Sequence, residues 1–228
     1  GEVLRKVRAG QRLSYDDAML LWELPDLEYL GYLARQVKLR HSQNKVYFNV
    51  NRHINITNVC VSRCGLCAFS RDPEDRDAYT LTVDEVLKLV RQGNDITEVH
   101  IVSGLHPQLG LEYYTRLFRE LRLHFPQLQI QALTPAEIGH LALLENTSCG
   151  RIIRELRSVG LTALPGGGAE IFSPRVRSII CPGKISGEQW LAISKTAHRL
   201  GLPSNATMLY GHIETLGERI GHLLALRA

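Results

Sequence analysis

Apolar residues recur at helical spacing near the start of the chain. Between residues 13 and 39 they repeat every three or four positions, with one interruption at Pro25. Residues 46–56 then alternate between apolar and polar side chains, which predicts one or two strands. We therefore expect two parts, a helical N-terminal extension over residues 1–45 and a second domain over residues 46–228.

Strand and helix patterns alternate through the rest of the chain. Strand patterns occupy five segments, at residues 46–56, 96–102, 128–133, 161–164 and 202–210. Helical patterns follow these strands, and three of them begin with a Thr that is followed three residues later by a Glu, at Thr82, Thr134 and Thr215. Such a capping box explains Glu137 and Glu218 without any catalytic role.

This alternation predicts an α/β fold. Strand–helix units of this length form a parallel sheet with helices outside it, and functional residues lie in the loops after the strands. We predict a partial (β/α) barrel of the TIM type over residues 46–228. A closed barrel of eight strands needs about 250 residues. We therefore expect the barrel to be incomplete at its C-terminal end and the chain to be a fragment that lacks the last strands.

The composition is that of an ordinary globular protein, with 44% hydrophobic and 22% charged residues. The formal net charge of +4 arises from scattered Lys and Arg residues, which argues against nucleic acid as a partner. No apolar run approaches the roughly 20 residues of a membrane span, and the first residues lack a signal sequence. We expect a cytoplasmic protein with no membrane partner.

Three of the five cysteines lie within eight residues, at Cys60, Cys64 and Cys67. An odd number of cysteines clustered in this way is a poor framework for disulfides and a good one for a metal. Three thiolates on one short loop can bind three irons of a [4Fe-4S] cluster, which leaves the fourth iron open. An open iron can chelate the amino and carboxylate groups of S-adenosylmethionine and pass an electron to its sulfonium. The spacing thus indicates radical chemistry.

A structural zinc site is the alternative interpretation of these cysteines. Zinc in a structural role takes four tetrahedral ligands, usually in two separated pairs. The remaining cysteines, Cys149 and Cys181, are isolated in the sequence, and we interpret them as unpaired thiols. The pattern therefore favours the cluster over zinc.

The cysteine loop and the Ala-Phe-Ser that follows it at residues 68–70 resemble the radical S-adenosylmethionine (radical SAM) superfamily. Within that superfamily, further stretches resemble the aminofutalosine synthases of the futalosine route to menaquinone. These stretches are residues 52–55, 98–102, 104–107, 164–172, 181–184 and 205–215. The three glycines at residues 166–168 are shared with the cyclase of the same pathway and with deazaflavin-cofactor synthases. The sequence Tyr-Gly-His-Ile-Glu-Thr at residues 210–215 favours the synthase.

The resemblance implies a transferase that uses a [4Fe-4S] cluster and takes SAM as a co-substrate. The reaction implied joins the 5'-deoxyadenosyl radical to 3-[(1-carboxyvinyl)oxy]benzoate and gives 6-amino-6-deoxyfutalosine, methionine and bicarbonate. The partners implied are this small-molecule substrate and an electron donor such as flavodoxin or ferredoxin. Two other interpretations stay open: a related radical enzyme such as dehypoxanthine futalosine cyclase, and a non-catalytic protein that binds a cluster or zinc.

Candidate binding residues follow from the resemblance and from positions after predicted strands. Phe69 would present its backbone and ring to the adenine of SAM. Ser103 and Gly104 lie where the family usually has two glycines that contact the methionine amino group, and Glu170 is a candidate for cofactor hydroxyls or a substrate group. The candidates for substrate contact are His106, Asn205, Thr207 and His212. We expect Asn205 and Thr207 to face inward on the last strand. No residue is assigned a catalytic role.

Overall fold

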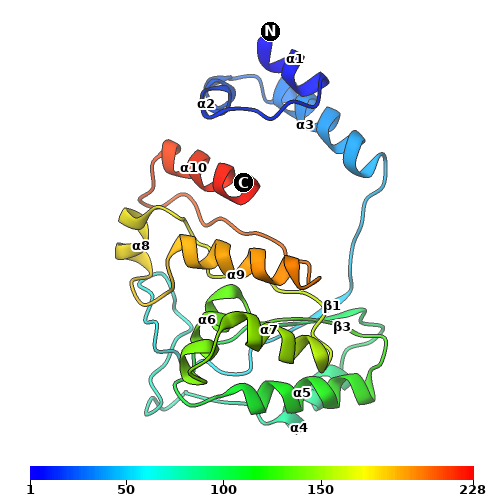
Figure 1. Ribbon diagram of the computed structural model, residues 1–228, viewed down its shortest axis with the longest axis vertical. Helices are drawn as coiled ribbons and strands as arrows, with labels where there is room; N and C mark the ends of the chain where they lie inside the picture. Colours follow the sequence, from blue (N-terminus) through cyan, green and yellow to red (C-terminus); the bar gives the residue numbers. More distant parts are fainter. The chain divides into compact units, whose positions relative to one another are not determined.

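The computed structural model covers residues 1–228, which form two compact units (Figure 1). The helical unit consists of Gly1–Phe48 together with Glu214–Ala228, and the sheet unit consists of Asn49–Ile213. The last helix, which the sequence analysis included in the barrel domain, thus groups with the N-terminal helices. The domain division at residue 45 stays a prediction.

Four helices make up the helical unit. They are α1 (Glu2–Arg8), α2 (Tyr15–Glu23), α3 (Leu27–Ser42) and α10 (Leu216–Arg227). A capping box between Ser14 and Asp17 begins α2, and the Asp17 carboxylate also accepts a hydrogen bond from Lys6 Nζ at 2.8 Å. α10 packs against α2, where the Arg219 guanidinium lies 5.4 Å from the centre of the Trp22 ring. These contacts explain why α10 belongs to this unit.

The sheet unit is built on three parallel strands. In spatial order they are β1 (Asn51–Ile54), β2 (Glu98–Ile101) and β3 (Gln129–Ala132). Ile54 lies opposite Ile101, and Ile101 lies opposite Ala132, so the carboxyl ends of the strands meet at one edge of the sheet. The α/β fold with a partial parallel barrel is therefore confirmed.

The fourth and fifth predicted strands are shorter than the sequence pattern suggests. Each contributes a single parallel bridge that continues the order of the sheet, Ala163 with Gln131 and Ser204 with Leu164. Beyond that point the side chains of Asn205 and Thr207 bind the backbone N–H and carbonyl of Gly166. Because side chains occupy these backbone groups, the regular strand ladder does not extend here.

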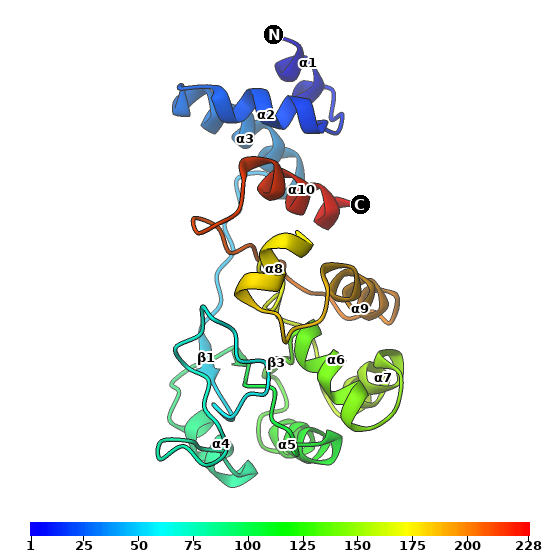
Figure 2. The same cartoon turned by 90° about the vertical axis from the view of Figure 1, so that its left-hand side faces the viewer.

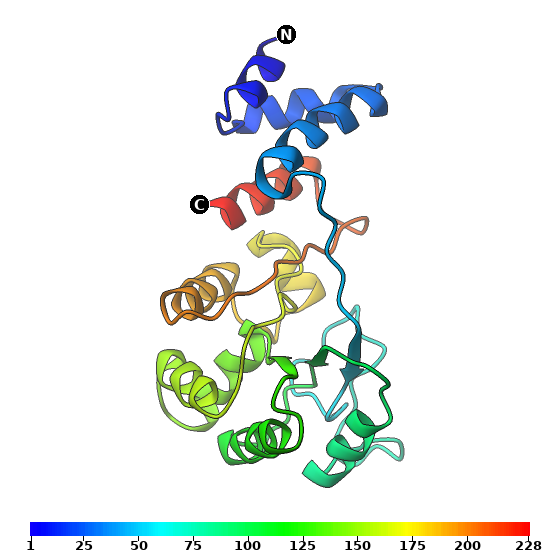
Figure 3. The ribbon, with the colours of Figure 1, turned by 90° about the vertical axis from the view of Figure 1, so that its right-hand side faces the viewer.

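Helices cover the strands on the outside. Their bounds are α4 (Val83–Arg91), α5 (Leu111–His124), α6 (Pro135–Leu144), α7 (Cys149–Ser158), α8 (Pro174–Ile180) and α9 (Gly187–Arg199). Figures 2 and 3 show α4, α5, α7 and α9 following one another in an arc around the strands, and consecutive helices of this series are in contact. The short helix α8 has no counterpart in the sequence prediction. No helix of the chain combines the length and apolar composition that crossing a bilayer requires.

Local sequence signals placed the helix starts correctly. Capping boxes begin α4 at Thr82, α6 at Thr134 and α10 at Thr215, as predicted. The apolar faces of α4 and α6 and the strands share one buried core, in which Val99, Ile101 and Ile130 are fully buried. Burial of this apolar surface fixes the strands, and the strands position the loops that follow them.

Candidate cluster and cofactor site

The three clustered cysteines line one cavity of about 240 Å³ at the carboxyl-terminal edge of the strands. Loops after β1, β2 and β3 and the glycine run all contribute to its lining. Among the predicted residues, those that the structure brings together in this cavity are Cys60, Cys64, Cys67, Phe69, Ser103, Gly104 and Glu170. Loops at this edge carry the functional groups of parallel α/β folds. A larger hollow of about 800 Å³ lies beside the starts of α4 and α5 and contains no cysteine.

The cysteine loop is held from two sides by backbone hydrogen bonds. Val61 N–H donates to the Leu105 carbonyl at 3.0 Å, and Gly65 N–H donates to the Ile180 carbonyl at 3.0 Å. All five cysteines of the chain are free thiols, with Cys64 buried and Cys67 exposed. The loop is therefore fixed in place while its thiols stay available to a ligand.

The donor set fits an iron–sulfur cluster. Three thiols on one loop face a common cavity, and neither of the remaining cysteines lines it. Thiolate ligands select iron–sulfur clusters, Zn or Cu(I) among the metals that proteins bind. No three His, Cys, Asp or Glu side chains are grouped as ligands of one metal ion. Cys60, Cys64 and Cys67 would each hold one corner of a [4Fe-4S] cluster, which supplies the electron for SAM cleavage when it is bound.

Gly104 and Ser103 connect the loop after β2 to the chain after β1. A Cβ atom on Gly104 would overlap the Val59 carbonyl, so only glycine fits there. Ser103 Oγ accepts a hydrogen bond from Ile56 N–H at 2.9 Å. The serine that replaces the family's usual glycine therefore has a structural partner, and it also lines the cavity.

Glu137 is a residue of this cavity that the sequence analysis missed. Its carboxylate accepts hydrogen bonds from Thr134 N–H at 2.7 Å and from Ser103 N–H at 2.9 Å. Burial is the main influence on this group and raises the pKa of Glu137 to about 7, although these hydrogen bonds act in the opposite direction. The capping prediction is confirmed but incomplete, because the same carboxylate lines the cavity. The sequence did offer one signal for this residue, because Glu137 closely follows a predicted strand and functional residues lie after the strands.

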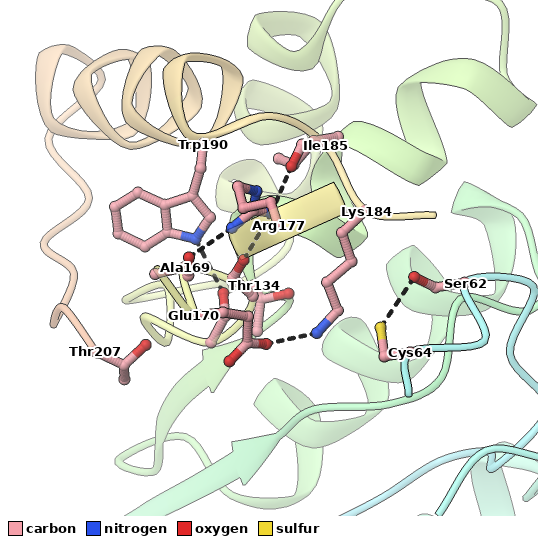
Figure 4. A network of polar contacts seen from close by, with 12 residues as sticks. Ser62, Cys64, Thr134, Ala169, Glu170, Arg177, Lys184, Ile185, Trp190 and Thr207 are labelled. Carbon is pink, nitrogen blue, oxygen red and sulfur yellow. Dashed lines mark hydrogen bonds and ion pairs between the residues drawn. The ribbon is translucent and has the colours of Figure 1, made fainter. Parts of the chain in front are cut away.

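Glu170 is paired with Lys184, another cavity residue that the sequence analysis did not select. Lys184 Nζ lies 2.6 Å from Glu170 Oε1, and both side chains are largely buried (Figure 4). Glu170 has a φ of 47°, an uncommon conformation for a residue with a side chain. The Arg177 guanidinium, close by, donates hydrogen bonds to the carbonyls of Gly168 and Ala169. Arg177 thereby fixes the backbone from which Glu170 projects.

Four predicted substrate-contact residues do not line the cavity. His106 Nδ1 accepts hydrogen bonds from the backbone of Gln108 and Leu109, which gives it a role in a turn. Asn205 and Thr207 hold Gly166, as described above, and His212 Nε2 lies 3.2 Å from the Leu209 carbonyl oxygen. Substrate contact by these residues stays a prediction. Phe69 does line the cavity, and it packs edge-on against Tyr79.

The partial parallel barrel and the three-cysteine cavity at its strand edge indicate an enzyme that binds an iron–sulfur cluster. The comparison with known protein families agrees with this class. Residues 54–226 match the Radical SAM superfamily. The chain therefore belongs to this superfamily, whose enzymes use a [4Fe-4S] cluster and SAM. The structure of methylornithine synthase superimposes with a TM-score of 0.74 at 20% identity, over 98% of this chain and 64% of that one. At that identity the likeness concerns the fold.

Two curated relatives are much more similar in sequence. The chain is 45% identical over 228 residues to aminodeoxyfutalosine synthase of Streptomyces coelicolor, covering 99% of this chain and 59% of that protein. It is 41% identical over 196 residues to 5-amino-6-(D-ribitylamino)uracil–L-tyrosine 4-hydroxyphenyl transferase of Methanopyrus kandleri, covering 85% of this chain and 53% of that protein. The chain thus spans little more than half the length of these relatives.

Proposed function

We propose that this chain is the SAM-cleaving part of an aminofutalosine synthase. In the proposed reaction the C–S bond of SAM to its 5'-carbon breaks and that carbon forms a bond with the enol ether carbon of 3-[(1-carboxyvinyl)oxy]benzoate. The substrate's carboxyl group then leaves as bicarbonate with uptake of one water molecule, so the products are 6-amino-6-deoxyfutalosine, methionine, bicarbonate and a proton. The observation that carries the proposal is the 45% identity to the Streptomyces synthase over 99% of the chain. The three-cysteine cavity at the strand edge supports it.

The residues of the cavity have distinct tasks in this proposal. Cys60, Cys64 and Cys67 hold the cluster, while Phe69 and the Ser103–Gly104 backbone hold SAM. The residues of the lining hold the reacting groups in contact, an effect that can lower a reaction barrier by about 7–11 kcal/mol. A cytoplasmic flavodoxin or ferredoxin is the proposed electron donor.

A second candidate function has its own support. The Methanopyrus relative at 41% identity is named a tyrosine 4-hydroxyphenyl transferase, which is a different reaction. Since the cavity residues described here handle SAM and the cluster, they do not distinguish the two. Dehypoxanthine futalosine cyclase is a third candidate, because it shares the triple-glycine stretch at residues 166–168.

An anaerobic product assay tests these candidates. The protein is reconstituted with iron and sulfide, reduced with dithionite and mixed with SAM. Separate reactions contain 3-[(1-carboxyvinyl)oxy]benzoate, dehypoxanthine futalosine, or 5-amino-6-(D-ribitylamino)uracil with tyrosine, and products are identified by mass spectrometry. We expect 6-amino-6-deoxyfutalosine in the first reaction, and none with a Cys64→Ser variant.

Each other result has a definite meaning. Product in the second or third reaction alone would replace the synthase with the corresponding enzyme. Formation of 5'-deoxyadenosine in all three would keep the radical SAM activity and reject the proposed substrate. A fully formed cluster without any SAM cleavage would support a non-catalytic role for this chain.

A further inference from the structure

The turn formed by residues 181–184 packs directly against the cysteine loop. Gly65 of that loop bonds the Ile180 carbonyl just before the turn, and a Cβ atom on Gly183 would lie 2.5 Å from the Ser62 carbonyl oxygen. Cys181 and Cys64 belong to the same small buried cluster. The two segments are far apart in sequence but form one wall of the cavity, and nothing in the proposed reaction explains this second segment.

This turn carries Lys184 into the cavity. Lys184 N–H closes the turn on the Cys181 carbonyl at 3.1 Å, and the Lys184 side chain is only 18% exposed. In Figure 4 its ammonium group lies between the Glu170 carboxylate and the Cys64 sulfur. Lys184 is the only cationic side chain in the lining of this cavity, alongside the carboxyl groups of Glu137 and Glu170.

A buried ammonium group needs compensating negative charge. Glu170 supplies one charge at 2.6 Å, and it holds the ammonium group in place. Burial by itself lowers the pKa of Lys184, but Glu170 and the nearby Cys64 and Cys181 raise it above its ordinary value, so the group is protonated at neutral pH. A fixed positive charge therefore stands beside the thiol ligands.

Charge next to an iron–sulfur cluster changes its reduction potential. The potential depends on net charge and on hydrogen bonds to the sulfurs, and interactions between charges are strong where water is excluded. Reduction adds one electron to the cluster from an external donor, so a nearby cation stabilises the reduced form more than the oxidised form.

We propose that Lys184, oriented by Glu170, raises the reduction potential of the [4Fe-4S] cluster held by Cys60, Cys64 and Cys67. Lys184 is thus a tuning residue for cluster reduction, and Glu170 is its positioning residue. The inference rests on the cluster site and is independent of which substrate the enzyme uses.

The test is a potentiometric titration of the reconstituted protein without SAM, followed by electron paramagnetic resonance of the reduced cluster. For Lys184→Gln we expect about a tenfold lower ratio of reduced to oxidised cluster at a fixed potential, equivalent to about 59 mV for a one-electron couple. Lys184→Arg should stay close to the wild type. Lys195→Gln, at an exposed lysine on α9, removes the same charge away from the cavity and should leave the ratio unchanged.

Comparison of Glu170→Gln with the double variant Glu170→Gln, Lys184→Gln provides a second test, because both proteins lack the Glu170 carboxylate. The reduced fraction should be lower in the double variant, and the difference should be smaller than that between the wild type and Lys184→Gln, because Glu170 no longer holds the ammonium group in place. A difference as large as that between the wild type and Lys184→Gln would reject the positioning role of Glu170. Unchanged potentials in Lys184→Gln at full iron content would overturn the proposal, and so would an effect that appears only after SAM is added, because that would assign Lys184 to SAM binding.

Discussion

The carboxylate of Glu137 is shared between the start of α6 and the loop after β2. Its oxygens accept N–H groups from both Thr134 and Ser103, and it is almost completely buried. One side chain in the cavity lining thus joins the ends of two neighbouring strands. Such a group links the protonation state of the site to the stability of the sheet unit.

The stability of the protein should fall as the pH rises toward neutrality because of Glu137. Its pKa is about 7 in the folded chain against 4.5 ordinarily, so the folded state holds the proton longer and stability is lost between these two values. The loss is on the order of 3 kcal/mol by pH 8. Urea unfolding of the cluster-free protein at pH 5 and pH 8 measures it. In Glu137→Gln the difference in unfolding free energy between pH 5 and pH 8 should be smaller. An equal difference in the wild type and the variant would show that Glu137 is not its cause.

Individual cysteines should differ sharply in their importance for iron binding. Serine at Cys60, Cys64 or Cys67 removes a thiolate from the cavity, so iron and sulfide content after reconstitution should drop strongly. Cys149 lies outside the cavity, and Cys149→Ser should keep the wild-type content. Cys181→Ser should also keep it, because Cys181 packs behind Cys64 rather than in the cavity lining. Iron loss in Cys181→Ser without loss of stability would make Cys181 a ligand.

At the scale of elements, the site depends on how closely the turn at residues 181–184 approaches the cysteine loop. Gly183→Ala places a Cβ atom against the Ser62 carbonyl, and the two backbones must separate. Forcing an extra methyl group into a packed site costs about 1–3 kcal/mol. We expect a lower melting temperature and faster iron loss to a chelator.

Gly150→Ala is the matched control for this substitution. Gly150 lies in α7, and its added Cβ atom would make an ordinary contact with Thr196 at 3.6 Å. Alanine suits a helix better than glycine, so stability should stay the same or rise by about 0.5–1 kcal/mol. If both alanine variants melt at the wild-type temperature, the close approach of the two loops is not maintained in solution.

At the scale of the whole molecule, an exposed apolar segment connects α3 to β1. Val46, Tyr47 and Phe48 have 79%, 75% and 89% of their surface exposed, and they lie outside any helix or strand. Exposed segments of this kind are preferred sites of proteolysis. Brief chymotrypsin treatment should cut after Tyr47 or Phe48 before it cuts elsewhere, as checked by mass spectrometry. The double variant Tyr47→Ser, Phe48→Ser should resist, whereas first cuts elsewhere in the wild type would show that this segment is protected.

Sequence signals that act over a few residues predicted their structures well. Each capping box depends on a Thr and a Glu three positions apart, so the starts of α4, α6 and α10 could be located without knowledge of the fold. The extent of the last two strands could not, because it depends on side chains of Asn205 and Thr207 that reach Gly166, about 40 residues away.

The sequence alone determined the cysteine loop, the alternation of strands and helices and the superfamily, since each rests on spacing within a short segment. The tertiary structure decided which other side chains enter the cavity. Glu137 comes from the start of α6 and Lys184 from the turn after α8, and only the parallel sheet and the packing of α8 bring them to the cavity of Cys64. Their charges have consequences because burial removes water from around them, and burial is a property of the folded chain.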